Sequence, residues 1–280
     1  MKKAAVFPGK YIQGDGVLQE IGELIRPFFV KKPMILWGKR TRSATADIVY
    51  ASFKEAGMEI VERMLPGECT KQECANIVAE VKEKGCDIII GLGGGKALDL
   101  SKAVANHAGL RNFIVPTAAS IDAPTSACTV WYHEDGSFQS FELWPVNPEI
   151  ILVDTEVCIT APVHMFLAGV GDALATYVEA KACYAAHAVA CSGGTPTLTA
   201  LAMAKLCYDI LLEYTEAALL AIEAGAVTPA FEKVVEATTL LSGIGWESGG
   251  VATAHVLGNT LANFPEAHRH MHGEKVAMGI

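Results

Sequence analysis

The sequence has few charged residues, and its basic residues form no cluster. Only 19% of the 280 residues are charged, whereas 51% are hydrophobic, and 22 Lys and Arg against 31 Asp and Glu give a net charge of −9. A chain of this composition can bury a large core, which excludes a disordered protein. Without a stripe of Lys and Arg it also lacks the electrostatic footprint of a nucleic-acid-binding protein. Small molecules are therefore the expected ligands.

Disulfide, export and membrane signals are also lacking. The eight cysteines are scattered through apolar segments without a CxxC pair, which predicts buried, reduced thiols. The start, MKKAAVFPGKY, lacks the long apolar stretch of a secretory signal, and the most apolar later segment, residues 198–224, carries several charges. We therefore expect a cytoplasmic protein that does not enter a membrane.

The pattern of apolar residues changes near residue 160. Before it, short β-branched runs alternate with amphipathic stretches, which predicts βαβ units on a mostly parallel sheet. After Thr160 the strand signal disappears and Ala and Leu recur at helical spacing. We predict an α/β nucleotide-binding domain over 1–160 and an all-α, metal-binding domain over 161–280. The last residues stop inside a predicted helix, so the helical domain could be incomplete as given. The runs and stretches of the first part are 34–37, 44–55, 58–62, 72–84, 87–90, 112–115 and 149–153.

The two standard phosphate-binding motifs are missing from the glycine-rich segment 87–102. GxGxxG would need glycine at Lys96, and the P-loop would need Ser or Thr at Ala97. The segment nevertheless predicts a strand, a glycine turn and a helix. Backbone amides of residues 93–95 could approach phosphate oxygens closely, and the helix N-terminus and Lys96 would attract them. The alternative is a tight turn that only needs glycine for its backbone geometry.

A second loop, residues 117–126, follows a predicted strand and is rich in hydroxyl groups, with one carboxylate at Asp122. Such side chains at the end of a strand suit recognition of a polar ligand. An ordinary turn with hydroxyl and Asx capping would have the same composition.

A candidate metal site lies in the helical half, although HExxH is absent. Asp172 stands in an apolar stretch, where a carboxylate is costly unless it is paired or binds a metal. His255 follows, and then the cluster His268, His270 and His272. One carboxylate and two imidazoles make an open site for a divalent ion. Each single histidine could equally be a satisfied or exposed side chain.

Taken together, these segments carry a resemblance along the whole chain. The sequence resembles the glycerol dehydrogenases, within the group III or iron-containing polyol dehydrogenase superfamily. The resemblance implies a dehydroquinate synthase-like fold with a nucleotide-binding domain, a helical domain and a catalytic cleft between them, and it implies a homo-oligomer. The motifs that carry it are residues 8–11, 93–99, 115–117, 122–126, 169–175, 247–250 and 272–275.

The resemblance also assigns roles to individual residues. It implies that Asp172, His255 and His272 hold the metal and that Asp122 contacts the substrate, so that these four form the catalytic centre; His268 and His270 receive no ligand role. Cys128 stands where the family usually has leucine. The positions matching the cofactor pocket are Gly94, Gly95, Lys96, Asp99, Thr117, Ser120, Ser126, Cys128 and Tyr132.

One departure from the family concerns the choice of cofactor. After the first βα strand the family commonly has Gly-Asp, whereas this sequence has Gly38, Lys39 and Arg40. A carboxylate there would bind the ribose 2′-hydroxyl of NAD, but Lys39 and Arg40 would attract the 2′-phosphate of NADP. We expect Lys39 to contact the cofactor, which is NAD or, because of these cations, NADP. Zinc is the metal expected first, with iron and manganese open.

The function implied is reversible, metal-dependent hydride transfer from glycerol or a related vicinal diol to NAD(P), which gives dihydroxyacetone or a hydroxyketone. No general base is evident from the residues. Two other enzymes on the same fold remain open: an NADPH-dependent 2-oxo-acid reductase and a dehydroquinate-synthase-like lyase. A non-catalytic nucleotide-binding or assembly subunit is the alternative from another class.

Overall fold

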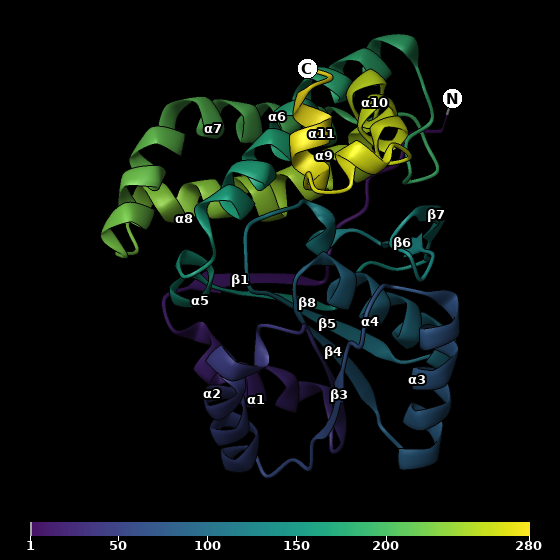
Figure 1. Ribbon diagram of the computed structural model, residues 1–280, viewed down its shortest axis with the longest axis vertical. Coiled ribbons are helices and arrows are strands. Elements are labelled where there is room, and N and C mark those ends of the chain that lie inside the picture. Colours follow the sequence, from purple (N-terminus) through teal and green to yellow (C-terminus); the bar gives the residue numbers. More distant parts are fainter. Residues whose placement is uncertain (1) are drawn as a thin grey trace. The chain divides into compact units, whose positions relative to one another are not determined.

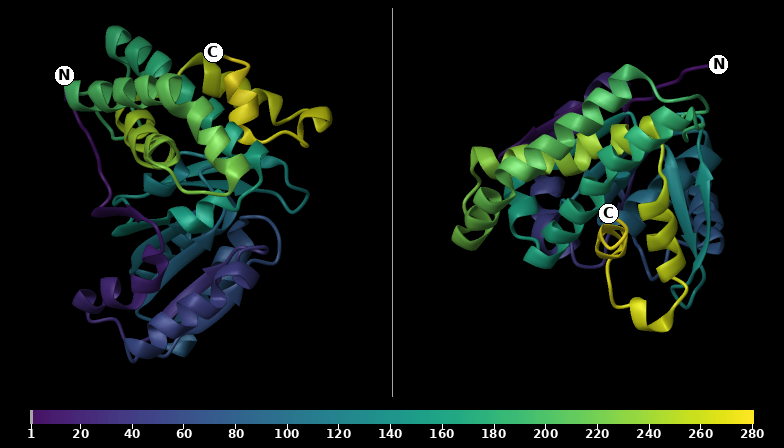
Figure 2. Two further views of the ribbon diagram at one scale, coloured as in Figure 1. Left: turned by 90° about the vertical axis from the view of Figure 1, so that its left-hand side faces the viewer. Right: turned by 90° about the horizontal axis from the view of Figure 1, so that it is seen from above.

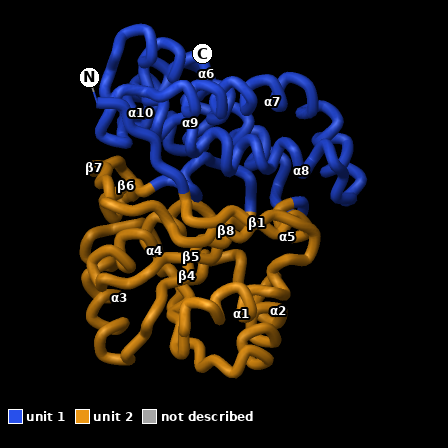
Figure 3. The backbone as a smooth tube through the Cα atoms, turned by 180° about the vertical axis from the view of Figure 1, so that it is seen from behind, with its two compact units in different colours: residues 1–7, 118–126, 159–280 blue, residues 8–117, 127–158 orange. Residues whose placement is uncertain are grey.

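The computed structural model describes residues 2–280, and the chain divides into two compact units (Figure 3). The first unit comprises residues up to 7 together with 118–126 and 159–280. The second comprises residues 8–117 and 127–158. Each unit is thus built from segments that are separate in the sequence. Independent domains over 1–160 and 161–280 stay a prediction.

The second unit contains a six-stranded, fully parallel sheet in the order β1-β8-β5-β4-β2-β3. Every residue of β2, β4 and β8 is buried. Burial on both faces explains why these strands are continuous apolar runs rather than alternating patterns. The strands are β1 (Lys10–Gly14), β2 (Pro33–Trp37), β3 (Val61–Met64), β4 (Ile88–Gly93), β5 (Arg111–Pro116) and β8 (Ile150–Asp154).

Helices cover both faces of this sheet (Figure 1). Met34 and Leu36 of β2 belong to the cluster that packs against α3 and α4, whereas Ile35 and Trp37 belong to the cluster beneath α1 and α2. The alternation follows from the two-residue period of a strand. The helices are α1 (Ile21–Ile25), α2 (Arg42–Glu55), α3 (Lys71–Lys84) and α4 (Gly95–Ala108).

Some elements differ from the sequence-based expectation. The run expected at 58–62 forms a strand only from Val61, because Gly57 ends α2 in a left-handed turn (φ 72°) and Met58 still donates to the carbonyl of Phe53. The edge strand β1 was not expected. Neither was the antiparallel hairpin of β6 (Cys128–Tyr132) and β7 (Phe138–Leu143).

Residues 161–280 are helical, with no strand longer than one isolated bridge. The helix α6 packs against α7, α9 and α11 (Figure 2), and α11 ends at Ala277 rather than continuing to residue 280. The predicted fold class, a parallel α/β sheet followed by helices, is confirmed. The helices after β8 are α5 (Thr155–Ile159), α6 (Val163–Ala186), α7 (Leu198–Ala224), α8 (Pro229–Glu236), the π-helical turn Ala237–Leu241, α9 (Ser242–Gly249), α10 (Thr253–Leu261) and α11 (His272–Ala277).

The prediction of free thiols is confirmed. All eight thiols are free, and all but the half-buried Cys191 are buried. Across residues 2–280, no helix combines the length and the apolar character that crossing a bilayer requires.

Candidate functional site

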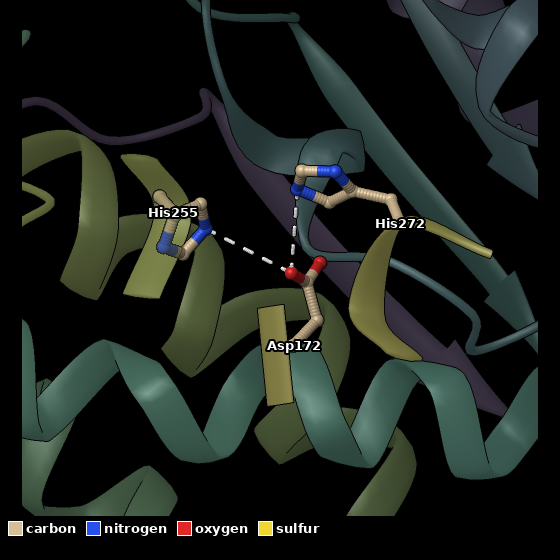
Figure 4. A group of neighbouring side chains, drawn as sticks. All are labelled: Asp172, His255 and His272. Atoms are coloured by element: carbon tan, nitrogen blue, oxygen red, sulfur yellow. Dashed lines mark ion pairs between the residues drawn. The ribbon is translucent and has the colours of Figure 1, made fainter. Parts of the chain in front are cut away.

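The first unit brings together one carboxylate and two imidazoles from three helices (Figure 4). Asp172 lies in the middle of α6, His255 in the first turn of α10, and His272 at the first residue of α11. Nε2 of His255 is 3.7 Å and Nε2 of His272 is 3.5 Å from Oδ1 of Asp172. One donor atom from each residue lies within 4.8 Å of the others. By contrast, His268 and His270 are exposed side chains.

The chemistry of this cluster fits a divalent cation. Asp172 is fully buried, and within residues 2–280 its Oδ1 has no hydrogen-bond donor. Burial raises the pKa of Asp172 to about 6, although the charge of His255 opposes this shift. A buried carboxylate oxygen without a donor is costly, and a cation held jointly with two imidazole nitrogens would remove that cost. These three residues therefore suit an ion such as Zn²⁺ or Fe²⁺.

Asp122 lies next to this cluster and is also buried. Its backbone N–H donates to Oδ2 of Asp172 (3.4 Å), and its Oδ2 accepts a hydrogen bond from Oγ of Ser242 (3.0 Å). The Ser242 hydroxyl is also 2.7 Å from that of Thr176. Burial, and then the charge of Asp172, raise the pKa of Asp122 to about 7. The site thus holds two carboxyl groups in one buried network.

Residues that the sequence analysis did not single out support these groups. Ser242 begins α9 directly after the π-helical turn, an irregularity often found at functional sites. Glu179, which lies on α6, contacts the ring of His255. Its position seven residues after Asp172 was a usable signal, because two helical turns return to the same face. No comparable signal marked Ser242.

The predicted phosphate loop lies in the second unit, where strand order reverses between β2 and β4. Gly94 precedes α4, and a Cβ at Gly94 would meet nothing within 4 Å. A Cβ at Gly93 (φ 154°) would lie 2.9 Å from Cα of Gly38, so the ends of β2 and β4 touch through glycines. In open α/β sheets, ligands bind at such a switch point beyond the carboxyl ends of the strands. The exposed helix N-terminus there suits a phosphate.

The charge of Lys96 at this loop is already engaged. Its Nζ is 2.6 Å from Oε1 of Glu68 and lies 5.8 Å from the ring centroid of Tyr132. The other oxygen of Glu68 is buried and has no hydrogen-bond partner within the described residues. A ligand phosphate at the loop would therefore compete with Glu68 for Lys96.

Asp99 lies behind the loop in a buried ion pair. Its carboxylate is 3.0 Å from Nζ of Lys102 and accepts the N–H of Val130 (3.0 Å), while Lys102 also donates to the carbonyl of Cys128 (2.9 Å). These contacts join α4 to β6 and place Cys128 and Tyr132 on a hairpin beside the loop. A direct contact of Asp99 with a dinucleotide stays a prediction.

The remaining predicted cofactor residues fall into both units. Thr117 follows β5 in the second unit, with its hydroxyl 3.3 Å from that of Thr41. Ser120 and Ser126 belong to the first unit and are buried. Lys39 and Arg40 are exposed immediately after β2. Their contacts with a cofactor stay predictions.

The acidic side chain beside the end of β2 is Glu62. It accepts hydrogen bonds from Nε1 of Trp37 (2.9 Å), from Tyr50 and from Arg42 (3.4 Å). Although burial acts in the opposite direction, these hydrogen bonds hold the pKa of Glu62 below its usual range. Glu62 is therefore an ionised group that already pairs with Arg42.

Comparisons with known proteins agree with this architecture. The model of the family "Iron-containing alcohol dehydrogenase" matches residues 8–155. A glycerol dehydrogenase of Escherichia coli O6:H1 is 44% identical over 279 residues, which span all of this chain and 76% of the relative. A glycerol dehydrogenase of Pseudomonas putida is 42% identical with the same coverage. The crystal structure of glycerol dehydrogenase from Schizosaccharomyces pombe superposes with a TM-score of 0.94 at 36% identity, covering 99% of this chain and 71% of that one. The chain therefore belongs to the iron-containing alcohol dehydrogenase family of oxidoreductases.

Proposed function

We propose that this protein oxidises glycerol, or a related vicinal diol, to the corresponding hydroxyketone with NAD(P) and one divalent metal ion. The observation that carries the proposal is the buried Oδ1 of Asp172, which lacks a hydrogen-bond donor among residues 2–280 and faces two imidazole nitrogens. The similarity to glycerol dehydrogenases supports the choice of substrate. A small polyol, rather than a nucleic acid or a membrane, is the partner we propose.

The residues of the candidate site divide into three metal ligands and one substrate-binding group in this proposal. Asp172, His255 and His272 would hold the cation, for which zinc is the first choice. When bound, the cation supplies a Lewis acid for an alcohol oxygen, and the dinucleotide supplies the hydride acceptor. Asp122 would contact the polyol through its carboxyl group, which Ser242 holds in place by donating a hydrogen bond to Oδ2. The fixed position of Asp122 orients the substrate.

The dinucleotide is proposed to bind at the glycine loop of the second unit. The pyrophosphate would accept hydrogen bonds from the backbone N–H groups of Gly95 and Lys96, the first two residues of α4. Lys96 would add its charge once the phosphate displaces Glu68. A cytoplasmic location, suited to eight free thiols, and a homo-oligomeric state complete the proposal.

The decisive test is formation of NADH or NADPH, followed by absorbance, with glycerol and zinc-loaded protein. We expect reduction of at least one dinucleotide, loss of activity after treatment with a chelator, and recovery on adding Zn²⁺. A lyase would produce no net NADH, and an oxo-acid reductase would prefer 2-oxobutanoate with NADPH over glycerol. Reduction of neither dinucleotide by protein that holds one metal ion per chain would contradict the proposal.

Cofactor preference is predicted to depend on Lys39. Replacing this exposed cation by aspartate removes an attraction for a 2′-phosphate and adds repulsion. We expect Lys39→Asp to shift the ratio of kcat/KM for NAD over NADP about tenfold or more toward NAD, since a tenfold change needs only about 1.4 kcal/mol. The matched control is Lys54→Asp on the exposed side of α2. An equal effect of Lys39→Asp on both dinucleotides would show that Lys39 does not face the ribose.

A further inference from the structure

We propose that Glu179 is a positioning residue that orients His255 and selects which of its ring nitrogens faces the metal. The inference rests on the proposed metal-dependent function. Glu179 is not among the residues that would hold the cation or contact substrate. It acts only through His255.

The contacts of Glu179 involve both of its carboxylate oxygens. Oε2 is 2.5 Å from Nδ1 of His255. Oε1 accepts the backbone N–H groups of Ala252 (2.8 Å) and His255 (3.0 Å). The side chain of Glu179 is only 3% exposed, so water has little access to these bonds. One carboxylate therefore holds both the backbone and the ring of His255.

These contacts select the tautomer that a metal ligand needs. A carboxylate can only accept a hydrogen bond, so Nδ1 of His255 must carry the proton that it donates to Glu179. In the neutral ring, Nε2 then has the free lone pair, and Nε2 is the nitrogen that faces Oδ1 of Asp172 at 3.7 Å. Such partners typically increase the basicity of the ligand and fix its orientation.

The fold explains why Glu179 can do this. Asp172 and Glu179 lie seven residues apart on α6 and so project from the same face of that helix. The N-cap of α10, Ala252, has no capping side chain of its own, and Glu179 supplies acceptors at this helix end instead. A negative group is favoured there by the helix dipole. Glu179 thus ties the start of α10 to α6 and helps to place His255 beside Asp172.

The test measures metal binding rather than activity alone. Glu179→Gln keeps a carbonyl oxygen for the two backbone N–H groups but presents an amide NH₂ group to Nδ1, which favours the wrong tautomer. We expect the Kd for Zn²⁺, measured by competition with a chelator, to rise about 10- to 100-fold. The visible absorption spectrum of the Co²⁺-substituted variant should also change. The matched control is Glu216→Gln on the exposed side of α7, which should bind as wild type.

Two further measurements separate positioning from a purely structural role. Ring-nitrogen NMR shifts of His255 in the zinc-loaded wild type should report a protonated Nδ1, and the metal-free Glu179→Gln protein should keep most of the thermal stability of the wild type. Unchanged metal affinity and spectrum in Glu179→Gln would overturn the positioning role alone. The positioning role would also be overturned if Glu179→Gln lost metal affinity because its metal-free form unfolds. Failure of the wild type to bind a metal would instead contradict the proposed function itself.

Discussion

Asp172→Asn is expected to abolish stoichiometric metal binding and to lower kcat for glycerol oxidation about a thousandfold or more. Asparagine preserves the size of the side chain but replaces an anionic oxygen by a neutral amide, at the point where two imidazole nitrogens converge. Loss of the Lewis acid removes several kcal/mol of charge stabilisation from the transition state, and about 4 kcal/mol corresponds to a thousandfold in rate. Metal content by elemental analysis and turnover by NADH formation measure the two effects.

Stability distinguishes loss of metal from loss of the fold in this variant. The substitution removes a fully buried charge, so metal-free Asp172→Asn should unfold at a temperature no lower than metal-free wild type. Asp209→Asn is the control, because that carboxylate forms an exposed ion pair with Lys205. Full metal content with normal turnover in Asp172→Asn would refute the assignment of Asp172 as a ligand.

Gly273→Ala is expected to displace His272 although it does not alter any donor atom. A Cβ at residue 273 would lie 1.8 Å from the carbonyl oxygen of Ala168 and 3.0 Å from Cβ of Asp172. Because the first obstacle is backbone of α6, α11 must move away, and the adjacent His272 moves with it. We expect a loss of about 1–3 kcal/mol in the free energy of unfolding and about a tenfold or greater rise in the Kd for Zn²⁺.

Denaturant unfolding and zinc competition measure these two effects. Helix propensity alone favours alanine over glycine by about 1 kcal/mol, so the sign of the stability change tests whether the contact with α6 is as close as described. Gly67→Ala serves as the control, since a Cβ there would meet nothing within 4 Å. A stabilised Gly273→Ala protein with wild-type metal affinity would show that α11 does not need this close approach.

The strands and helices of the α/β half could be predicted because each is marked by a pattern of neighbouring residues. The segment from Asp87 to Lys102 contains a buried apolar run, three glycines and an amphipathic helix in direct succession, and it folds as β4, a turn and α4. The hairpin of β6 and β7 could not be found in the same way. Its strands form their ladder with each other and pack on α4 through Asp99 and Thr129, so its stability comes from tertiary contacts rather than from a strong apolar run.

The sequence shows which side chains could bind a metal, but it does not show which of them come together in one site. Asp172 is conspicuous because a carboxylate in an apolar stretch needs compensation, whereas His255, His268, His270 and His272 are equivalent by composition. The resemblance to a family separated them, and the structure brings His255 and His272 next to Asp172 while leaving His268 and His270 exposed.

By itself, the sequence determined the alternation of strands and helices, the glycine loop after β4 and the kinds of donor atoms available, because each depends on neighbouring residues. Only the tertiary structure decided which donors meet. The approach of α10 and α11 to α6 depends on long-range packing: Gly273 lets two helix backbones come close, and the Glu179 carboxylate holds the start of α10. Such contacts leave no local pattern, since they arise from the shape and charge of surfaces that are distant along the chain.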